Sequence, residues 1–293
     1  MANLYINAKV YTGTDHSSDA ITYAKKVIDG NAYSLEPHFQ NLFLADNNKS
    51  NEIIFPIESD GLHTQGYGGM TYIIHASVGG NMSASAFGIN GGWGGLRTTK
   101  QYVALFSDPS GNTDKRAMFF TDGQTLDIAD EYNFQNGYAI TKFKNITSTG
   151  AKGSDTNGNF VDTDFPMFRL ADIYLLYAEA VLRGGQGGDA GTALNYVNLV
   201  RTRAYDGSAS GNINASQLTL PFMLDERGRE LLFEGHRRTD LIRFGKFTGG
   251  DYLWQWKGGV LNGTSVGDFR NLMPIPSTDI INNPNLKQNN GYN

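Results

Sequence analysis

Hydrophobic residues recur at helical spacing in five parts of the chain. This periodicity predicts helices over residues 4–11, 18–29, 165–183, 193–204 and 224–244. Ser17 or Ser18 would cap the second helix, and the Gly184-Gly185 pair would end the third. The apolar coverage of the third helix is too wide for a single neighbour, so we expect this helix to pack on two sides.

The remaining residues predict strands, turns and long loops. We expect short strands at Glu52–Pro56, 117–121 and 138–143, and a helix over 101–106. Eleven of the 35 residues from Gly61 to Gly95 are glycine, so residues 58–100 are expected to be irregular. Long loops are expected at 206–219 and 248–271, and the C-terminus is expected to be extended, without a helix.

The order of these elements predicts the fold class. Residues 4–29 and 165–204 each form a helix pair similar to a tetratricopeptide unit, although the pairs do not follow at that repeat's period. We therefore predict a mainly α fold with tetratricopeptide-like helix pairs, long irregular loop insertions and a few short strands. One domain would cover residues 1–293, with a helix pair and strand at 1–57, a glycine-rich insertion region at 58–165 and a helical region with a tail at 166–293.

The predicted helix over residues 224–244 carries charged and apolar residues on all sides, which an ordinary surface helix does not. Opposite charges lie three or four residues apart, as pairs on a helix do. The expected pairs are Glu226 with Arg229, Glu234 with Arg237 and Arg238, and Asp240 with Arg243. We interpret them as structural ion pairs that fix the position of the helix, and His236 as a structural residue.

Composition excludes several functions. The net charge of −5 and the lack of a basic stripe argue against a nucleic-acid partner. The chain has no cysteine, so a disulfide scaffold and a thiol nucleophile are excluded. No apolar run approaches about 20 residues, and the first residues do not form a signal peptide. They are typical of the interior of an amphipathic helix, which suggests a chain that begins partway through a longer protein.

Several blocks resemble, in order, the SusD/RagB family of outer-membrane glycan-binding lipoproteins. The segment EIIFPI and the two helices before it are similar to the middle of such proteins. Four further blocks resemble their C-terminal half: FPMFRLADIYLLYAEAVLR, ALNYVNLVRTRA, LDERGRELLFEGHRRTDLIRFGKF and LMPIPSTDIINNPNLKQNNGY. The resemblance covers essentially the whole chain. The family's lipoprotein signal, lipidated cysteine and first helices have no counterpart in these residues.

The resemblance implies a binding protein rather than an enzyme. Family members hold polysaccharide at the outer-membrane surface of Bacteroidetes-type bacteria and deliver it to a SusC-like TonB-dependent transporter. The expected partners are therefore a polysaccharide or oligosaccharide and this transporter, and membrane attachment would need a lipid anchor missing from this chain. An α-glucan such as starch is the preferred ligand. The alternatives are a laminarin-type β-glucan, a glycoside hydrolase with an unrecognised carboxylate pair, or a protein-interaction scaffold.

The glycine-rich region contains the residues expected to contact sugar. Sugar rings combine an apolar C–H face with hydroxyl groups, so their sites need aromatic surfaces beside polar groups. Trp93 stands between glycines that leave its indole uncovered, although a tryptophan there can also fill the core. By resemblance to starch-binding relatives, Trp93 and Tyr67 match the aromatic positions around the glucan. Tyr72, Asn90 and Arg97 complete the candidate set.

Other candidate chemistry is weaker. Asp155–Asp164 places oxygen ligands at alternating positions, as calcium loops do, but lacks the glycine and glutamate of those loops, so we interpret it as a solvated turn. Trp254 and Trp256 form a second aromatic patch, on one side of the chain if the run is extended, which we assign to the core or to a transporter-facing surface. No catalytic or nucleotide-binding motif occurs, and we expect no cofactor and no metal.

Overall fold

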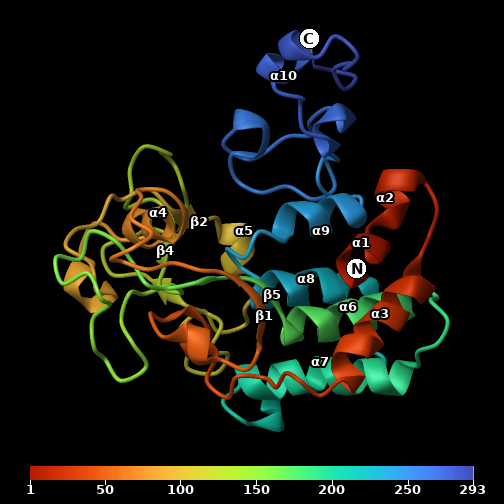
Figure 1. Cartoon of the computed structure of the whole chain (residues 1–293), viewed down its shortest axis with the longest axis horizontal. Helices are drawn as coiled ribbons and strands as arrows, with labels where there is room; N and C mark the ends of the chain where they lie inside the picture. Colours follow the sequence, from red (N-terminus) through yellow and green to blue (C-terminus); the bar gives the residue numbers. More distant parts are fainter. Residues whose placement is uncertain (293) are drawn as a thin grey trace. The chain divides into compact units, whose positions relative to one another are not determined.

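Helix α6 (Leu170–Leu182) lies at the centre of a helical array (Figure 1). It packs against α1 (Ala2–Ile6), α3 (Ser17–Asp29), α7 (Ala190–Ala204) and α8 (Leu220–Glu230). Because these helices cover it on several sides, ten of its thirteen residues are buried. The prediction that this helix packs on more than one side is confirmed.

The computed structural model describes residues 1–292, which fold as two compact units. The first unit, residues 1–237, contains the helical array, the glycine-rich region and every strand of the described residues. The second unit begins at Arg238 and contains most of α9 (Arg237–Arg243), α10 (Ser277–Asn282) and long loops. The mainly α fold with few short strands is confirmed, whereas the division into three segments stays a prediction.

Two small sheets belong to the first unit. Strand β1 (Ile53–Ile57) pairs antiparallel with β5 (Phe165–Arg169), and a second sheet has the order β2-β4-β3. Its strands are β2 (Arg97–Thr98), β3 (Phe119–Phe120) and β4 (Tyr138–Ile140). The three strands expected from the sequence are confirmed in shortened or shifted form. The expected helical start at residue 165 is wrong, because this segment bonds to β1 instead.

Several shorter helices also differ from the sequence prediction. The glycine-rich region contains α4 (Gly69–Ala76), which buries Met70 and Ile74, and the tail contains α10. Both segments were expected to lack helices. The first predicted helix divides into α1 and α2 (Ala8–Thr12) at Asn7, whose side chain donates to the backbone oxygen of Asn3 at 2.7 Å. This local hydrogen bond competes with the continuous helix. The helix expected over 101–106 is α5 (Lys100–Val103).

The helix predicted over residues 224–244 is in fact two, α8 and α9. The break contains Phe233 and Gly235, whose φ angles of 58° and 79° do not fit a right-handed helix. The backbone oxygens at the break have partners, since Arg169 donates to the oxygen of Glu230 at 2.8 Å and Lys142 to that of Leu232 at 2.7 Å. Cations from distant segments therefore satisfy the end of α8, and the helix does not need to continue.

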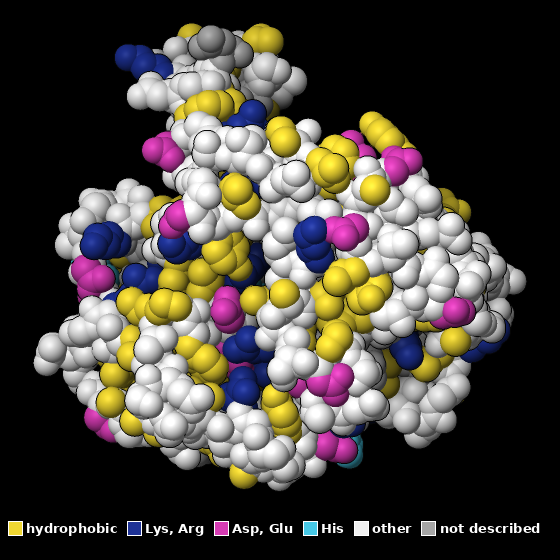
Figure 2. Space-filling view, turned by 180° about the vertical axis from the view of Figure 1, so that it is seen from behind, with side chains coloured by type: hydrophobic (Ala, Val, Ile, Leu, Met, Phe, Trp, Pro, Cys, Tyr) yellow, Lys and Arg dark blue, Asp and Glu magenta, His cyan; other side chains and the backbone are white. Residues whose placement is uncertain are grey.

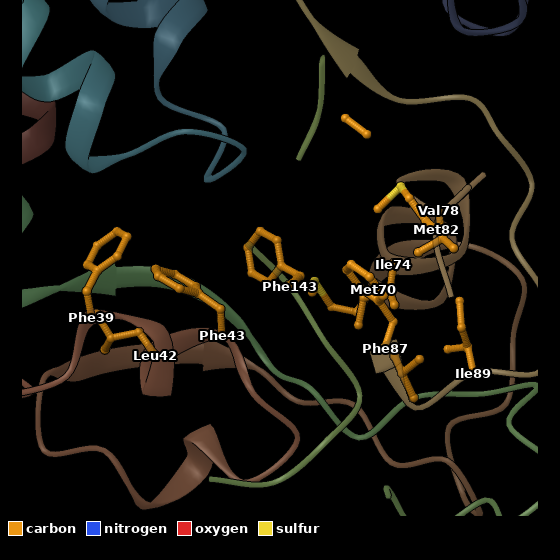
Figure 3. Packing of buried hydrophobic residues seen from close by; sticks show 12 residues of the cluster. Phe39, Leu42, Phe43, Met70, Ile74, Val78, Met82, Phe87, Ile89 and Phe143 are labelled. Carbon is orange, nitrogen blue, oxygen red and sulfur yellow. The ribbon is translucent and has the colours of Figure 1, made fainter. Parts of the chain in front are cut away.

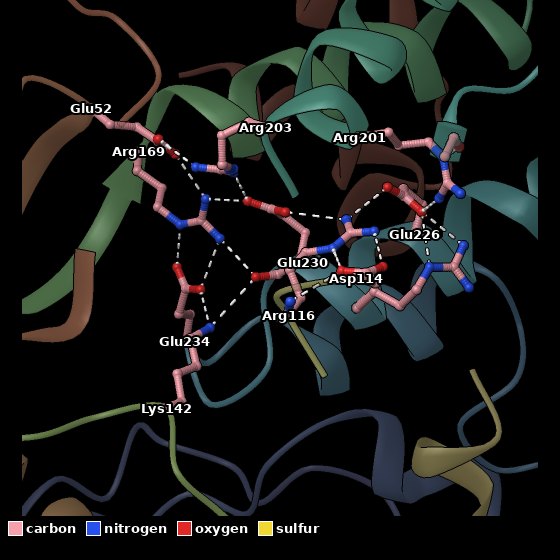
Figure 4. A network of polar contacts seen from close by, with 12 residues as sticks. Glu52, Asp114, Arg116, Lys142, Arg169, Arg201, Arg203, Glu226, Glu230 and Glu234 are labelled. Carbon is pink, nitrogen blue, oxygen red and sulfur yellow. Dashed lines mark hydrogen bonds and ion pairs between the residues drawn. The ribbon is translucent and has the colours of Figure 1, made fainter. Parts of the chain in front are cut away.

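A buried ion network explains why α8 carries charge on all sides (Figure 4). The guanidinium of Arg169, at the end of β5, lies 2.8 Å from the carboxylate of Glu52 and 2.6 Å from those of Glu230 and Glu234. Arg203 on α7 also pairs with Glu52 and Glu230. The network thus joins β1, β5, α7 and the end of α8, as the structural interpretation of these charges predicted.

Further pairs extend the network along α8. Arg116 lies 2.7 Å from Glu226 and from Asp114. The expected pairs Glu226–Arg229 and Asp240–Arg243 are present, at 2.8 Å and 2.6 Å. The expected pairing of Glu234 with Arg237 and Arg238 is wrong, because Glu234 binds Arg169 and Lys142. Partners from distant segments take the place of the local ones.

The hydrophobic core of the glycine-rich region forms around α4 and the turn at residues 39–43 (Figure 3). Phe43 contacts Phe39 and Phe143 edge-on, with ring centroids 5.0 Å and 5.1 Å apart. On the other side, Ile74 of α4 lies among Phe87, Ile89 and neighbouring side chains. This core gives the loops around α4 a fixed support.

None of the helices in residues 1–292 is long and apolar enough to cross a membrane.

Candidate functional site

The glycine-rich segment around Trp93 closes the C-terminal end of α4. The backbone N–H of Trp93 donates to the oxygen of His75 at 2.8 Å, and that of Gly94 to the oxygen of Val78 at 2.9 Å. Gly92 permits this approach, since a Cβ there would lie 2.2 Å from the oxygen of Val78. Glycine is needed because the backbone of the segment lies against the end of the helix. Backbone carbonyl groups in the last turn of α4 and just beyond it thus hold Trp93 in place.

The indole of Trp93 rests on the side chain of His75. The two ring centroids are 4.7 Å apart and the planes are inclined by 22°. His75 is buried, with Nδ1 2.7 Å from the oxygen of Gly91 and Nε2 3.1 Å from that of Asn159. Two backbone contacts fix the imidazole, and the imidazole in turn supports one face of the indole.

Three exposed rings form what we call the aromatic surface: Tyr67, Tyr72 and Trp93. The ring centroids of Tyr67 and Tyr72 lie 6.3 Å and 6.1 Å from that of Trp93. Their planes are inclined to the indole by 55° and 51°. The exposed fractions are 66% for Tyr67, 47% for Tyr72 and 45% for Trp93. The structure therefore brings the three predicted aromatic residues together at the surface.

Exposed hydrophobic side chains alone would not define a site. On the face shown in Figure 2, hydrophobic side chains reach the surface in several separate places. Single exposed apolar residues are common in soluble proteins. The aromatic surface differs because its three rings are adjacent and the central one, Trp93, lies on a buried histidine. Adjacent aromatic rings on a fixed support are typical of binding surfaces.

The two predicted polar residues differ in which of their hydrogen-bonding groups already have partners in the protein. Asn90 is exposed, and its amide donates to the side-chain oxygen of Asn159 at 2.7 Å. The guanidinium of Arg97 donates to the backbone oxygens of Gly95, Asn136 and Glu131 at 2.8, 2.8 and 2.7 Å. Burial lowers the pKa of Arg97. Arg97 thus joins two loop segments with three of its five N–H groups, whereas Asn90 keeps its amide oxygen available for a ligand.

The loop at residues 155–160 supplies two neighbours of the aromatic surface that the sequence interpretation missed. The ring of Phe160 lies 5.2 Å from that of Tyr67, and Asn159 contacts both His75 and Asn90. The carboxylate of Asp155 folds this loop by accepting N–H groups of Asn157, Asn159 and Phe160 at 2.9–3.0 Å. The alternating Asp and Asn residues of the segment were the available signal, since such residues form side-chain-closed turns.

The same hydrogen bonds determine the direction in which the pKa of Asp155 shifts. Burial would raise the pKa of Asp155, but the backbone N–H groups of Phe160, Asn157 and Asn159 outweigh it and lower the pKa. The carboxylate of Asp162 is also occupied, because it accepts the N–H of Gly61 at 2.7 Å and the hydroxyl of Ser154 at 2.7 Å. Within residues 1–292, no three His, Cys, Asp or Glu side chains are grouped so as to hold a metal ion.

The comparisons with known proteins agree with this fold. The family model described as the SusD family matches residues 108–292. Starch-binding protein SusD of Bacteroides thetaiotaomicron is 37% identical over 99% of this chain and 59% of its own length. SusD-like protein P2 of Formosa agariphila is 28% identical over 97% of this chain and 58% of its own length.

A solved structure extends the comparison. Surface glycan-binding protein A from Bacteroides thetaiotaomicron, in complex with laminarihexaose, matches with a TM-score of 0.72. It is 25% identical, and the match covers 99% of this chain and 63% of that protein. The helix pairs and long loop insertions define a mainly α scaffold of the tetratricopeptide-like class. The chain belongs to the SusD family, and it spans about 60% of the length of the relatives that it matches.

Proposed function

We propose that this chain binds a polysaccharide or oligosaccharide non-covalently at the aromatic surface, without cleaving it. The observation that carries the proposal is the arrangement of Tyr67 and Tyr72 around Trp93, with the indole supported by buried His75. The C–H faces of sugar rings stack on such rings, and the amide oxygen of Asn90 accepts a hydroxyl hydrogen.

The inclination of the three rings favours a curved glycan. Rings inclined by 55° and 51° to the indole form a surface that is not flat. An α-glucan such as starch coils, so successive sugar rings turn to meet successive aromatic faces. The relative that is 37% identical is named as starch-binding, which supports this choice. A laminarin-type β-glucan is the alternative, supported by the 25% identical structure that contains laminarihexaose.

The carboxylate of Asp155, in the loop beside the aromatic surface, supports a non-catalytic role. A glycosidase needs one carboxyl group that donates a proton and a second that acts as base or nucleophile. Asp155 accepts three backbone N–H groups, and these lower its pKa despite its burial. A carboxyl group held in its ionised form is a poor proton donor.

We also propose that the chain acts at the outer-membrane surface and delivers its ligand to a SusC-like transporter.

Affinity electrophoresis tests the proposal. The purified chain would be run through gels that contain starch, laminarin, xylan, mannan or levan. We expect retardation by starch, lost in Trp93→Ala and retained in Tyr132→Ala. Tyr132 is a suitable control because it is an aromatic residue with 91% exposure outside the aromatic surface. No retardation of a folded chain in any gel, or equal retardation of Trp93→Ala, would contradict the proposed site.

A further inference from the structure

The second unit contains a cavity of about 500 Å³. This volume is within the range of about 300–1,000 Å³ that is usual for small-molecule sites. All of the lining residues belong to the second unit, among them Phe247, Trp254, Lys257, Thr264, Phe269 and Arg270. The sequence interpretation assigned Trp254 to the core or to a transporter-facing surface, and the structure places it in a cavity wall.

Aromatic rings form two walls of the cavity. Trp254 is half-buried and stacks on Phe247, with centroids 6.2 Å apart and planes inclined by 29°. Phe269 forms the second wall. Its ring lies against Gly267, where a Cβ would come within 2.6 Å of the ring. Trp256 does not share this wall, because its φ of 67° interrupts the extended run that would place both tryptophans on one side. Two fixed aromatic faces suit a flat or ring-shaped ligand.

Two cations line the cavity without an acidic neighbour in its wall. The Nζ of Lys257 donates to the backbone oxygens of Gly249 and Tyr252 at 2.6 and 2.9 Å and lies 4.7 Å from the ring centroid of Trp254. The guanidinium of Arg270 lies over the ring of Phe269, 5.3 Å from the centroid. Among the described residues, it has no hydrogen-bond or ion-pair partner. A guanidinium with unused donors beside aromatic walls favours a ligand that carries negative charge.

The backbone beside Arg270 is held in place. Arg238 donates to the backbone oxygen of Arg270 at 2.7 Å, and its guanidinium lies 5.0 Å from the ring centroid of Phe247. One residue therefore connects the two walls of the cavity. The hydroxyl-bearing residues Thr264 and Ser265 add groups that can donate to or accept from a ligand. The cavity thus combines fixed aromatic faces, hydroxyl groups and a free guanidinium.

We propose that this cavity is a second carbohydrate-binding site, which takes a sugar ring bearing a carboxylate or a sulfate ester. The sugar's C–H face stacks against Trp254, and Arg270 binds the anionic group with two parallel N–H donors. The hydroxyl of Thr264 or Ser265 binds one of the other oxygens. This inference takes from the proposed function only the class of ligand, a carbohydrate. The residues are different, and the ligand is charged.

The test follows the indole N–H signals of the three tryptophans by NMR during titration. The probes are glucuronic acid, glucose 6-sulfate and glucose, with sodium acetate and sodium sulfate as the anions alone. We expect the signal of Trp254 to shift with one or both acidic sugars, with an affinity at least tenfold higher than for glucose and for either anion. The two acidic sugars distinguish a carboxylate from a sulfate as the preferred group.

Variants connect the binding to the cavity. We expect Arg270→Gln and Trp254→Ala each to weaken binding of the acidic sugar at least tenfold. Arg270 is exposed, so its replacement leaves the fold intact even where Trp254→Ala does not. Lys287→Gln removes an exposed cation of the same unit outside the cavity and should bind as the unchanged protein does.

Three results would overturn the proposal: glucose or an anion alone binding as tightly as the acidic sugars, unchanged binding in Arg270→Gln, or no shift of Trp254 with any probe. Trp93→Ala separates this proposal from the first one. It should abolish retardation in starch gels and leave the titration of Trp254 unchanged. Failure in the starch gels would contradict the aromatic surface alone, and failure of the titration would contradict the cavity alone.

Discussion

The indole of Trp93 lies 4.7 Å from the imidazole of buried His75, and the two rings are nearly parallel. The imidazole is itself held by backbone oxygens of Gly91 and Asn159. An exposed tryptophan in a loop would ordinarily sample several rotamers, which costs entropy when a ligand fixes one. The contact with His75 reduces this cost, so the position of Trp93 depends on a residue that does not reach the ligand.

This relationship predicts the effect of replacing His75. His75→Ala should weaken glycan retardation three- to tenfold, because the indole loses its support. It should also lower the stability by about 1–3 kcal/mol, since one of the buried backbone oxygens of Gly91 and Asn159 loses the N–H donor of the imidazole. Thermal unfolding and affinity electrophoresis measure the two effects. His75→Phe keeps a ring behind the indole and should recover part of the affinity, and an equal loss in both variants would contradict the supporting role.

The two tyrosines should contribute less than Trp93. An aromatic contact is worth about 0.5–1.5 kcal/mol, so Tyr67→Ala and Tyr72→Ala should each lower the affinity about two- to tenfold. Isothermal titration with maltoheptaose would measure it. The matched variants Tyr67→Phe and Tyr72→Phe retain the ring, so they should bind nearly as well as the unchanged chain. If the phenylalanine variants lose as much as the alanine variants, hydrogen bonding by the hydroxyl groups carries the contact instead of stacking.

The buried ion network should be the most sensitive part of the first unit. Arg169→Met leaves the carboxylates of Glu52, Glu230 and Glu234 without one of their partners. Loss of one member of a buried pair costs about 3–5 kcal/mol, so this variant should unfold at much lower urea concentration or fail to fold. Lys49→Gln is the control, because its pair with Asp46 is exposed on the lysine side. It should change the stability by less than about 1 kcal/mol.

The network also predicts a dependence of stability on acid. Burial would raise the pKa of Glu230, but Arg203, Arg169 and Arg116 outweigh it and lower the pKa to about 2. The unfolded chain binds this proton near pH 4.5, so between pH 4.5 and 2 it holds more protons than the folded chain. The free energy of unfolding should therefore fall as the pH decreases through this window, by about 1.4 kcal/mol per pH unit for each such carboxylate.

Carboxyl NMR signals would check this assignment directly. The side-chain carboxyl of Glu230 should remain ionised at pH 3, where a glutamate in the unfolded chain is largely protonated. A midpoint near 4.5 for Glu230 in the folded chain would show that the guanidinium groups do not outweigh burial. Glu226 titrates in the same direction for the same reason, since Arg116, Arg229 and Arg201 outweigh its burial and lower its pKa.

The sequence by itself determined the local elements and the candidate rings. Periodic apolar residues located α3, α6 and α7, because a helix buries residues at a fixed spacing. The glycines on both sides of Trp93 carry no side chains that could cover its indole, so the sequence also indicated an exposed ring. The family blocks added the fold class, which the comparisons confirm.

Only the tertiary structure decided which charges are buried and what lies behind the rings. Charge on all sides of α8 was visible in the sequence, but its partners Arg116, Arg169 and Arg203 come from distant segments. Periodicity reports the spacing of residues along one helix, whereas burial of a charge depends on which opposite charge the fold brings to it. The support of Trp93 by His75 and the cavity around Trp254 arise in the same way, from chain segments that meet only after folding.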